Sequence, residues 1–575
     1  MLTDRFRVDV ERNVAVPVRD GTVLRADLYL PRGAGPFPAL VQRTPYNKAH
    51  LPVVYNLDPL RAAGAGYAVL NQDTRGRFAS DGEFRPFRDE AADGYDTVEW
   101  AAAQPWCSGR VGMLGASYAG ANQLHAAAAG PPHLAAIAPW ITAADYHEGW
   151  TYQGGAFSLG FNLNWTLTRL APDALRRRGA SGASRDALLA ATDDLDDVYR
   201  RLPLTDVPEL LGAAPYYAEW LAHPEDGPYW EAIRIAGSYE RIGVPAFHLG
   251  AWYDIFLGGT LRNFGALGGR LVVGPWVHSV DLSNLSGEVD FGQRASRYVF
   301  DLDGELLRWF GRWLKPEPDE RVDPPVRLFV MGENAWRSER EWPLARARPT
   351  AYYLHSRGDA RSRHGDGGLS PEAPGDEPAD VYLADPYRPV PTRGGQNCCY
   401  PAALPAGAYD QSAIEARPDV LVYTTDPLER DLEVTGPVEV VLYAASSAPD
   451  ADVTAKLVDV APSGYARNLT DGILRGRYRE GTADGRLLTP GRTYELRVDA
   501  GATSNLFRRG HRIRLEVAAS NFPRFDRNPQ TGEPAAVARV LAPALQTVYH
   551  DRARPSRVIL SVVPRSEEGH RIAGA

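Results

Sequence analysis

The chain has 575 residues, of which 44% are hydrophobic and 23% are charged, and its formal net charge is −9. The length predicts roughly two to four domains, and the composition is typical of a globular protein. The acidic balance argues against a nucleic-acid partner, because phosphate binding needs a basic face. No apolar run is long enough to cross a bilayer, so we expect no membrane association.

Three cysteines occur, and the N-terminal residues 1–7 contain no apolar segment of the kind found in a signal peptide. Three cysteines are too few for a disulfide framework. Cys398 and Cys399 are adjacent, which would strain a bond between them. We therefore expect Cys107, Cys398 and Cys399 to be free thiols in a reducing compartment, and the protein to be cytoplasmic.

The first 140 residues alternate between predicted strands and helices. Apolar and polar residues alternate over 8–30, which predicts a hairpin with one solvated face. A helix is predicted over 89–102. Buried strands are predicted from short apolar runs at 38–41, 67–73, 111–114 and 134–139. This order is typical of a mostly parallel sheet covered by helices on both faces.

The predicted strand at 111–114 leads into Ser117, and a small-residue run at 119–129 predicts a helix directly after it. A serine placed between a strand and a helix is typical of a nucleophile elbow. The turn of such an elbow is too sharp for large neighbours, and the residues around the serine are Gly115, Ala119 and Gly120. The alternative interpretation is that Ser117 is an ordinary helix N-cap.

From about 145 to 240 the pattern changes, since charged helical segments follow a cluster of aromatic residues and no strand alternation is visible. Predicted strands resume at 245–250 and 271–273, and a helix is predicted at 300–314. Segment 145–240 is therefore expected to be a helical cap inserted into an α/β domain. After about residue 324, short alternating runs recur between turn residues, which predicts an all-β sandwich or jelly roll.

An elbow serine needs a base and a group that orients the base, each at the end of a later strand. Asp254 follows the predicted strand at 245–250, and His278 follows the one at 271–273. His278 would accept the Ser117 proton, and Asp254 would hold the imidazole tautomer. Singly, Asp254 could be a helix N-cap and His278 a loop histidine. Their order and strand context together favour a Ser–His–Asp triad.

Several longer motifs surround these residues. They are GASYAG at 115–120, AWYD at 251–254, GPWVH at 274–278, DTRG at 73–76, DGYDTVEW at 93–100, QPWC at 104–107, TSNLF at 503–507 and ASNFP at 519–523. Together they resemble the bacterial cocaine esterase and X-prolyl dipeptidyl-peptidase family of serine hydrolases, over essentially the whole chain. The resemblance implies an α/β-hydrolase core with an inserted helical cap and a C-terminal, galactose-binding-like β jelly roll.

The expected boundaries follow from these patterns. The core takes residues 1–144 and 241–323, the cap 145–240, and the jelly roll 324–575.

The resemblance also implies an oxyanion hole built from the hydroxyl of Tyr46 and the backbone N–H of Tyr118. Two donors aimed at the developing oxyanion are what acyl transfer requires. From the residues alone, Tyr46 would be interpreted as a packed aromatic side chain.

Relatives in this family differ in substrate. Some cleave peptides after proline, and others act on α-amino acid esters and β-lactam side chains. Both kinds of substrate carry an ammonium that calls for carboxylates. The resemblance places the acidic residues of the amino acid ester hydrolases directly after the triad aspartate, where this chain has the apolar segment 255–257.

That apolar segment favours a serine esterase for apolar or aromatic acyl groups that works through an acyl-enzyme. Phe256, together with Trp150 and Trp165 from the cap, is expected to line the acyl pocket. Carboxylates at Glu288 and Asp290 keep two alternatives open. These are an X-prolyl dipeptidyl-peptidase and an α-amino acid ester hydrolase or β-lactam acylase.

No HExxH or paired CxxC spacing occurs, so we expect neither a metal nor another cofactor. The expected partner is a small-molecule ester or amide. The oligomeric state stays open, with a homodimer among the candidates. A non-enzymatic alternative is a binding protein that uses the jelly roll.

Overall fold

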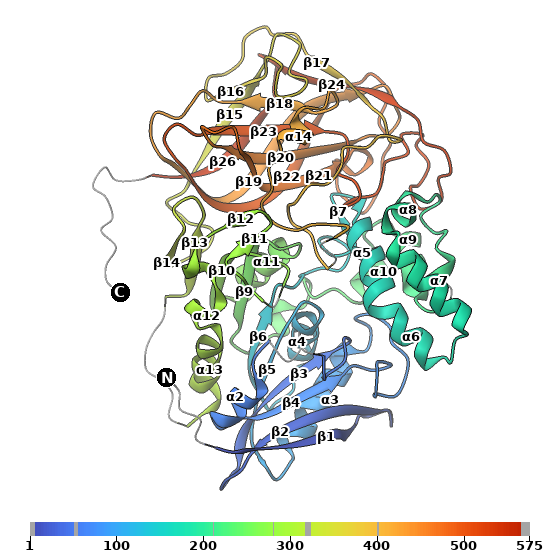
Figure 1. The fold of residues 1–575 in the computed structure, drawn as a ribbon, viewed down its shortest axis with the longest axis vertical. Helices are drawn as coiled ribbons and strands as arrows, with labels where there is room; N and C mark the ends of the chain where they lie inside the picture. Colours follow the sequence, from blue (N-terminus) through green and yellow to red (C-terminus); the bar gives the residue numbers. More distant parts are fainter. Residues whose placement is uncertain are drawn as a thin grey trace.

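The computed structural model describes residues 6–50, 56–210, 212–279, 281–316, 324–399 and 402–564. Residues 1–5, which belong to the segment searched for a signal peptide, lie outside that description, as does the domain boundary expected at 323. Figure 1 shows a sheet with helices on both sides, a helical cap beside it and a β-rich part above. The predicted α/β core, helical cap and β-rich C-terminal part are all present.

A ten-stranded sheet organises the N-terminal part, in the order β1-β2-β4-β3-β5-β6-β9-β10-β13-β14. Its central strands, from β4 to β13 in that order, pair in parallel, and the outer pairs are antiparallel. The strands are β1 (Val8–Pro17), β2 (Val23–Pro31), β3 (Phe37–Thr44), β4 (Ala68–Asp73), β5 (Cys107–Ala116), β6 (Leu134–Trp140), β9 (Phe247–Tyr253), β10 (Arg270–Val277), β13 (Val326–Val330) and β14 (Ala335–Glu339).

Helices bury both faces of this sheet. Successive residues of a strand point to opposite faces. Accordingly, Ala39 and Val41 of β3 pack in the same core as α3 and α4, whereas Leu40 packs with α2 and α13. Because both faces are buried, the sequences of the central strands contain continuous apolar runs without alternation. The helices of this part are α2 (Pro59–Gly64), α3 (Glu90–Ala102), α4 (Tyr118–Ala129), α11 (Leu257–Leu267), α12 (Arg297–Phe300) and α13 (Leu302–Leu314), with η4 (Gln293–Ala295) and the short pair β11 (Leu285–Ser286) and β12 (Val289–Asp290) beside them.

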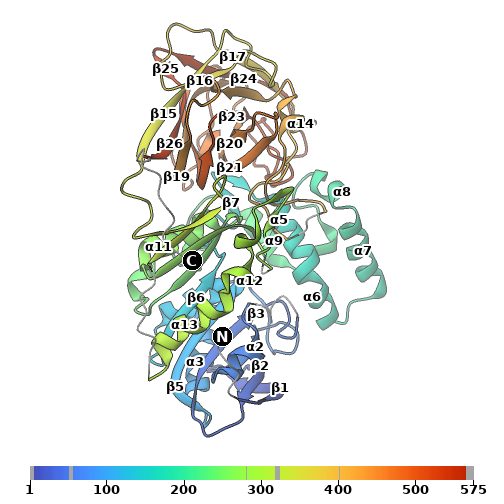
Figure 2. The same cartoon turned by 60° about the vertical axis from the view of Figure 1, so that its left-hand side comes forward.

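The cap is helical, as predicted, and lies to one side of the sheet (Figure 2). It also contains a two-stranded hairpin, β7 (Tyr152–Gln153) and β8 (Ala156–Phe157), which is too short to produce visible alternation in the sequence. The helices are α5 (Leu159–Trp165), the π-helix η1 (Thr166–Leu170), α6 (Ala171–Arg177), α7 (Gly182–Asp193), α8 (Leu195–Arg200), η2 (Pro208–Leu210), α9 (Pro215–Ala222), α10 (Pro228–Glu231) and η3 (Tyr239–Arg241). In the part of the chain that the structure describes, none of the helices is long and apolar enough to span a membrane.

Twelve strands form a single hydrogen-bonded network in the C-terminal part. They are β15 (Arg348–His355), β16 (Gly368–Ser370), β17 (Asp380–Ala384), β18 (Leu421–Thr424), β19 (Leu432–Ser446), β20 (Asp452–Val460), β21 (Ala466–Arg475), β22 (Tyr494–Phe507), β23 (Arg512–Ala518), β24 (Ala544–Asp551), β25 (Arg554–Pro555) and β26 (Arg557–Val563), with α14 (Ser412–Glu415) and η5 (Gly476–Tyr478) between them.

The core sheet continues beyond the boundary expected at residue 323. β13 pairs in parallel with β10, with Val326 opposite Leu271, and β14 then pairs with β13. The sequence placed these strands in the jelly roll, because apolar alternation reports burial and does not identify the partner strand.

Candidate active site

Ser117 occupies a strained turn between β5 and α4, with φ 61° and ψ −122°. A positive φ is uncommon for a residue other than glycine and costs on the order of 1–3 kcal/mol. The small neighbours predicted from the sequence make the turn possible. At Gly115 a Cβ would lie 2.7 Å from Cβ of Ala119, and at Gly120 it would lie 2.9 Å from the carbonyl oxygen of Trp140. The geometry is therefore that of a nucleophile elbow.

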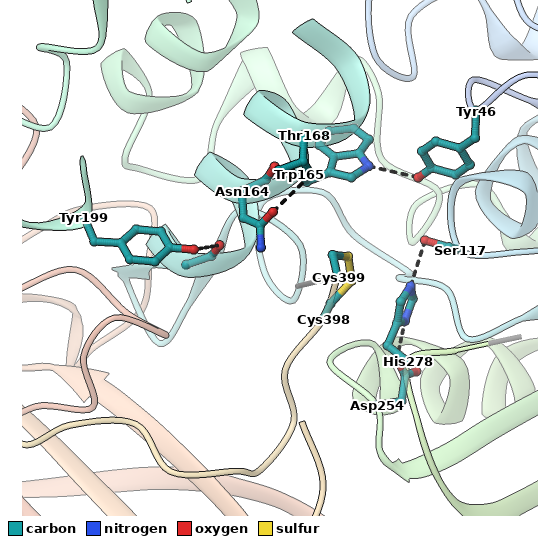
Figure 3. The surroundings of a disulfide bond; sticks show 11 residues. Tyr46, Ser117, Asn164, Trp165, Thr168, Tyr199, Asp254, His278, Cys398 and Cys399 are labelled. Atoms are coloured by element: carbon teal, nitrogen blue, oxygen red, sulfur yellow. Dashed lines mark hydrogen bonds and ion pairs between the residues drawn. A yellow bond between two sulfur atoms is a disulfide. The ribbon is translucent and has the colours of Figure 1, made fainter. Parts of the chain in front are cut away.

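The structure brings Ser117, His278 and Asp254 into one chain of hydrogen bonds (Figure 3). Nε2 of His278 lies 3.1 Å from Oγ of Ser117, and Nδ1 lies 2.6 Å from Oδ1 of Asp254. Asp254 directly follows β9 and His278 directly follows β10, so adjacent parallel strands deliver both side chains to one edge of the sheet. This geometry lets the imidazole accept the serine proton while the carboxylate holds the ring.

The C-terminal part supports both loops that carry these side chains. Asn397 forms an isolated parallel bridge with Asp254, and the next residue, Cys398, forms one with His278. Gln396 also donates a hydrogen bond from Nε2 to the carbonyl oxygen of Trp252, at 3.2 Å. A short segment of the second domain therefore spans the two triad loops of the first.

Tyr46 follows β3, and its side chain lies near Ser117 and Trp165 (Figure 3). Nε1 of Trp165 donates a hydrogen bond to this hydroxyl oxygen, at 2.9 Å. Burial raises the pKa of Tyr46 and outweighs the opposing hydrogen bonds with Trp165 and Ser117. The phenol therefore stays protonated at neutral pH. Because Trp165 supplies one proton to the oxygen, the phenolic proton is left to donate elsewhere.

Tyr118 is the first residue of α4, so its backbone N–H has no acceptor within the helix. Among the described residues, no backbone or side-chain acceptor is found for it. Its side chain is engaged elsewhere, since the Tyr118 hydroxyl accepts from the backbone N–H of Phe87 and donates to Glu90. The N–H at the elbow and the hydroxyl of Tyr46 are thus two available donors beside Ser117.

A cavity of about 590 Å³ opens in front of Ser117 and His278. Of the three aromatic residues expected to line an acyl pocket, Trp165 lines this cavity, and Trp150 and Phe256 are not in its lining. Trp150 and Phe256 are buried and stack on each other, with ring centroids 4.4 Å apart. Phe256 also packs edge-to-face against His278, with ring centroids 5.2 Å apart. It therefore contacts the imidazole without lining the cavity.

Four charged residues line the cavity that the sequence did not mark as site residues. Two of them, Asp173 and Arg176, pair with each other at 2.6 Å. Arg169, from the π-helix η1, and Asp281, just after His278, are both exposed, and neither has an ion pair with any described residue. Glu288 and Asp290, the carboxylates that kept the peptidase alternative open, do not line the cavity. Glu288 pairs with Arg393 at 2.9 Å, and Asp290 accepts a hydrogen bond from Asn284 at 2.7 Å. No sequence pattern marked Arg169, because a π-helix has no distinct periodic signature.

The prediction that all three cysteines are free thiols is wrong. Cys398 and Cys399 form a disulfide bond, and Cys107 is free and buried. Adjacent cysteines can pair here because Cys399 adopts φ 84°, a left-handed conformation that the sequence did not reveal. The two sulfurs and a ring nitrogen of His278 lie within 4.8 Å of one another. They offer no free set of metal ligands, because the sulfurs bond to each other and both ring nitrogens have partners.

Two family models and a curated relative match this chain over most of its length. Residues 20–280 match the family model described as X-Pro dipeptidyl-peptidase (S15 family), and residues 321–559 match the X-Pro dipeptidyl-peptidase C-terminal non-catalytic domain. The chain is 40% identical over 573 residues to the cocaine esterase of Rhodococcus sp. (strain MB1 Bresler), covering 97% of this chain and 99% of that protein.

Two solved structures superpose over nearly the whole chain. An aminopeptidase from a marine sediment Thaumarchaeota archaeon and an α-amino acid ester hydrolase each give a TM-score of 0.80 at 25% identity. Each comparison covers 98% of this chain and 97% of the other.

Proposed function

This chain belongs to the X-Pro dipeptidyl-peptidase (S15) family of serine hydrolases, and we propose that it hydrolyses carboxylic esters with apolar or aromatic acyl groups through a covalent acyl-enzyme. The assignment as a serine hydrolase that acts on esters agrees with its 40% identity to cocaine esterase over most of its length. The observation that carries the proposal is the hydrogen-bonded chain Ser117–His278–Asp254 at the wall of the 590 Å³ cavity.

In the proposed reaction, Oγ of Ser117 attacks the ester carbonyl carbon while Nε2 of His278 accepts the serine proton. The resulting oxyanion receives hydrogen bonds from the hydroxyl of Tyr46 and the N–H of Tyr118. Collapse of the tetrahedral intermediate leaves the acyl group on Ser117, and His278 returns the proton to the departing alcohol. Water then repeats the sequence and releases the acid, while Asp254 stabilises the imidazolium in each half.

The preference for apolar acyl groups is supported by the residues beside the serine. Trp165 lines the cavity, and no residue of the segment that follows Asp254 brings a carboxylate to it. Arg169 adds a like charge that disfavours an ammonium group. A flat apolar acyl group would therefore bury its surface against Trp165, and it carries no charge of its own that would need a partner in the cavity.

We expect a benzoyl ester to be hydrolysed with a kcat/KM roughly tenfold or more above that of an α-aminoacyl ester or an Ala-Pro anilide. A missing charge-assisted hydrogen bond costs about 1.5–3 kcal/mol, and the ammonium substrates would lack theirs. The measurement is a side-by-side assay of p-nitrophenyl benzoate, a p-nitrophenyl aminoacyl ester and the anilide. A higher kcat/KM for the anilide would reject the esterase preference.

A second candidate activity, on α-aminoacyl esters or Xaa-Pro peptides, rests on Asp281. Its carboxylate is exposed in the cavity lining and has no ion pair with any described residue, so it is available to an ammonium. If the wild-type enzyme prefers aminoacyl substrates and Asp281→Asn removes that preference, this second activity is the correct one. An unchanged preference in the variant would exclude Asp281 as the ammonium partner.

Tyr46→Phe is expected to lower kcat by roughly a hundredfold, with a smaller change in KM. The phenolic proton would bind the oxyanion more strongly than the ground-state carbonyl, so its loss should appear in the chemical step. Steady-state kinetics with a p-nitrophenyl ester measure both constants. Tyr387→Phe, a distant tyrosine whose hydroxyl donates to the carbonyl of Leu541, is the matched control. A change confined to KM would show that Tyr46 only positions substrate.

A further inference from the structure

The Cys398–Cys399 disulfide lies at the catalytic histidine. Figure 3 shows the bonded sulfurs between the cap helix that carries Trp165 and the ring of His278. Cys399 belongs to the cavity lining together with Ser117 and His278. Cys398 is only 1% exposed and faces away from solvent, whereas Cys399 is partly exposed. Cys399 is therefore the member of the pair that borders the space in which substrate binds.

We propose that Cys398–Cys399 is a thiol–disulfide exchange site inside the active-site cavity, and that its reduction by a dithiol lowers hydrolysis at Ser117. The activity readout rests on the proposed esterase function, and the exchange itself does not.

The exchange follows ordinary thiol chemistry. A thiolate of the external dithiol attacks Sγ of Cys399, the cysteine that borders the cavity, and the S–S bond breaks with Sγ of Cys398 as the leaving group. The second thiol of the reagent then displaces Cys399, forming the disulfide of the reagent. Two electrons and two protons pass from the dithiol, and both cysteines end as thiols. An oxidised dithiol reverses the reaction.

Breaking the Cys398–Cys399 bond would affect hydrolysis in two ways, through the cavity wall and through His278. Cys399 holds φ 84°, a conformation that costs a residue with a side chain on the order of 1–3 kcal/mol, and the bond to its neighbour helps to retain it. Without that bond, Cys399 is free to leave the left-handed region and the cavity wall changes shape. Cys398 is bridged to the backbone of His278, so a change in this segment also reaches the residue that must align with Ser117.

The test measures the thiols and the activity of the full-length protein separately. Native protein is treated with dithiothreitol, freed of reagent, labelled with iodoacetamide and digested for mass spectrometry. We expect labelling at Cys399 only after reduction. In aliquots of the reduced protein kept free of iodoacetamide, kcat/KM for p-nitrophenyl benzoate should fall on the order of tenfold, as expected if one strained residue relaxes. After removal of dithiothreitol, an excess of oxidised glutathione should re-form the bond in these aliquots and restore the value.

Two variants distinguish the loss of the Cys398–Cys399 bond from other effects of the reductant. In the double variant Cys398→Ser/Cys399→Ser, kcat/KM should be low from the start and insensitive to dithiothreitol. Cys107→Ala removes the free buried cysteine at the far end of β5 and should keep the full response of the wild type. The fluorophosphonate labelling rate of Ser117 gives a second readout that does not depend on the choice of ester.

Two results would overturn the proposal. One is the absence of labelling at Cys399 after reduction under native conditions, which means that the bond is not exchangeable. The other is labelling without any change in kcat/KM or in the labelling rate of Ser117, which means that the pair does not control the site. Exchange at Cys399 together with an altered rate at Ser117, in a protein that cleaves no tested ester, would contradict the esterase function and leave the exchange site standing.

Discussion

Ser117→Ala is expected to abolish ester hydrolysis, with kcat falling on the order of 10⁴- to 10⁶-fold. The serine oxygen lies 3.1 Å from Nε2 of His278, and in the described structure no other hydroxyl has that ring nitrogen as its partner. His278→Ala should cost about as much. The double variant should cost little more than either single change, because nucleophile and base act as one unit.

The decisive measurement is kcat with a p-nitrophenyl ester, combined with labelling by a fluorophosphonate. Wild-type protein should take up one equivalent of label at Ser117, and the alanine variant should take up none. Stoichiometric labelling would also exclude a binding protein with an inactive core. Ser184→Ala, on the exposed helix α7, is the control for serine replacement as such. Near-normal hydrolysis by Ser117→Ala would end the assignment of the nucleophile.

Asp254→Asn is expected to lower kcat by about 10⁴-fold while leaving the fold intact. Oδ1 of Asp254 accepts a hydrogen bond from the Nδ1–H of His278, at 2.6 Å, which leaves Nε2 free to act as a base toward Ser117. An asparagine can present its amide N–H to Nδ1 instead, and this favours the tautomer that carries its proton on Nε2. Asp254 is fully buried, so little water is available to take over its role.

The measurements for this variant are kcat and the thermal unfolding midpoint. The midpoint distinguishes a lost tautomer from a lost fold. Asp290→Asn makes the same chemical change at an exposed carboxylate outside the cavity, and its kcat should match the wild type. If Asp254→Asn proves silent, another carboxylate must orient His278, and the strand assignment behind the triad would have to be revised.

The triad geometry was predictable from the sequence because it depends on local patterns. Short apolar runs marked the parallel strands, and parallel strands place their following loops at one edge of a sheet. Ser117, Asp254 and His278 come three to five residues after the ends of such runs, so their order and context were enough to predict that they lie together. The same reasoning placed the hairpin, the cap and the β-rich part.

Features that depend on long-range contacts could not be predicted in this way. The disulfide depends on the backbone conformation of Cys399, and the approach of this pair to His278 joins segments about 120 residues apart. Trp165 was expected to line the cavity, but its hydrogen bond to Tyr46 was not foreseen, because that contact joins the cap to the core. The apolar alternation of β13 predicts that one of its faces is buried, but it does not identify the sheet that the strand joins.

The bridges of Asn397 and Cys398 to the triad loops also bear on how the protein is made. His278 leaves the ribosome about 120 residues before Cys398. At about 5–20 residues per second, this gap corresponds to roughly 6–24 s during which all three triad residues exist without their support from the second domain. The nascent chain therefore contains Ser117, Asp254 and His278 without this support while about 120 further residues are added. We therefore expect full hydrolytic activity only after the segment that contains Asn397 and Cys398 has been translated and has docked on both loops.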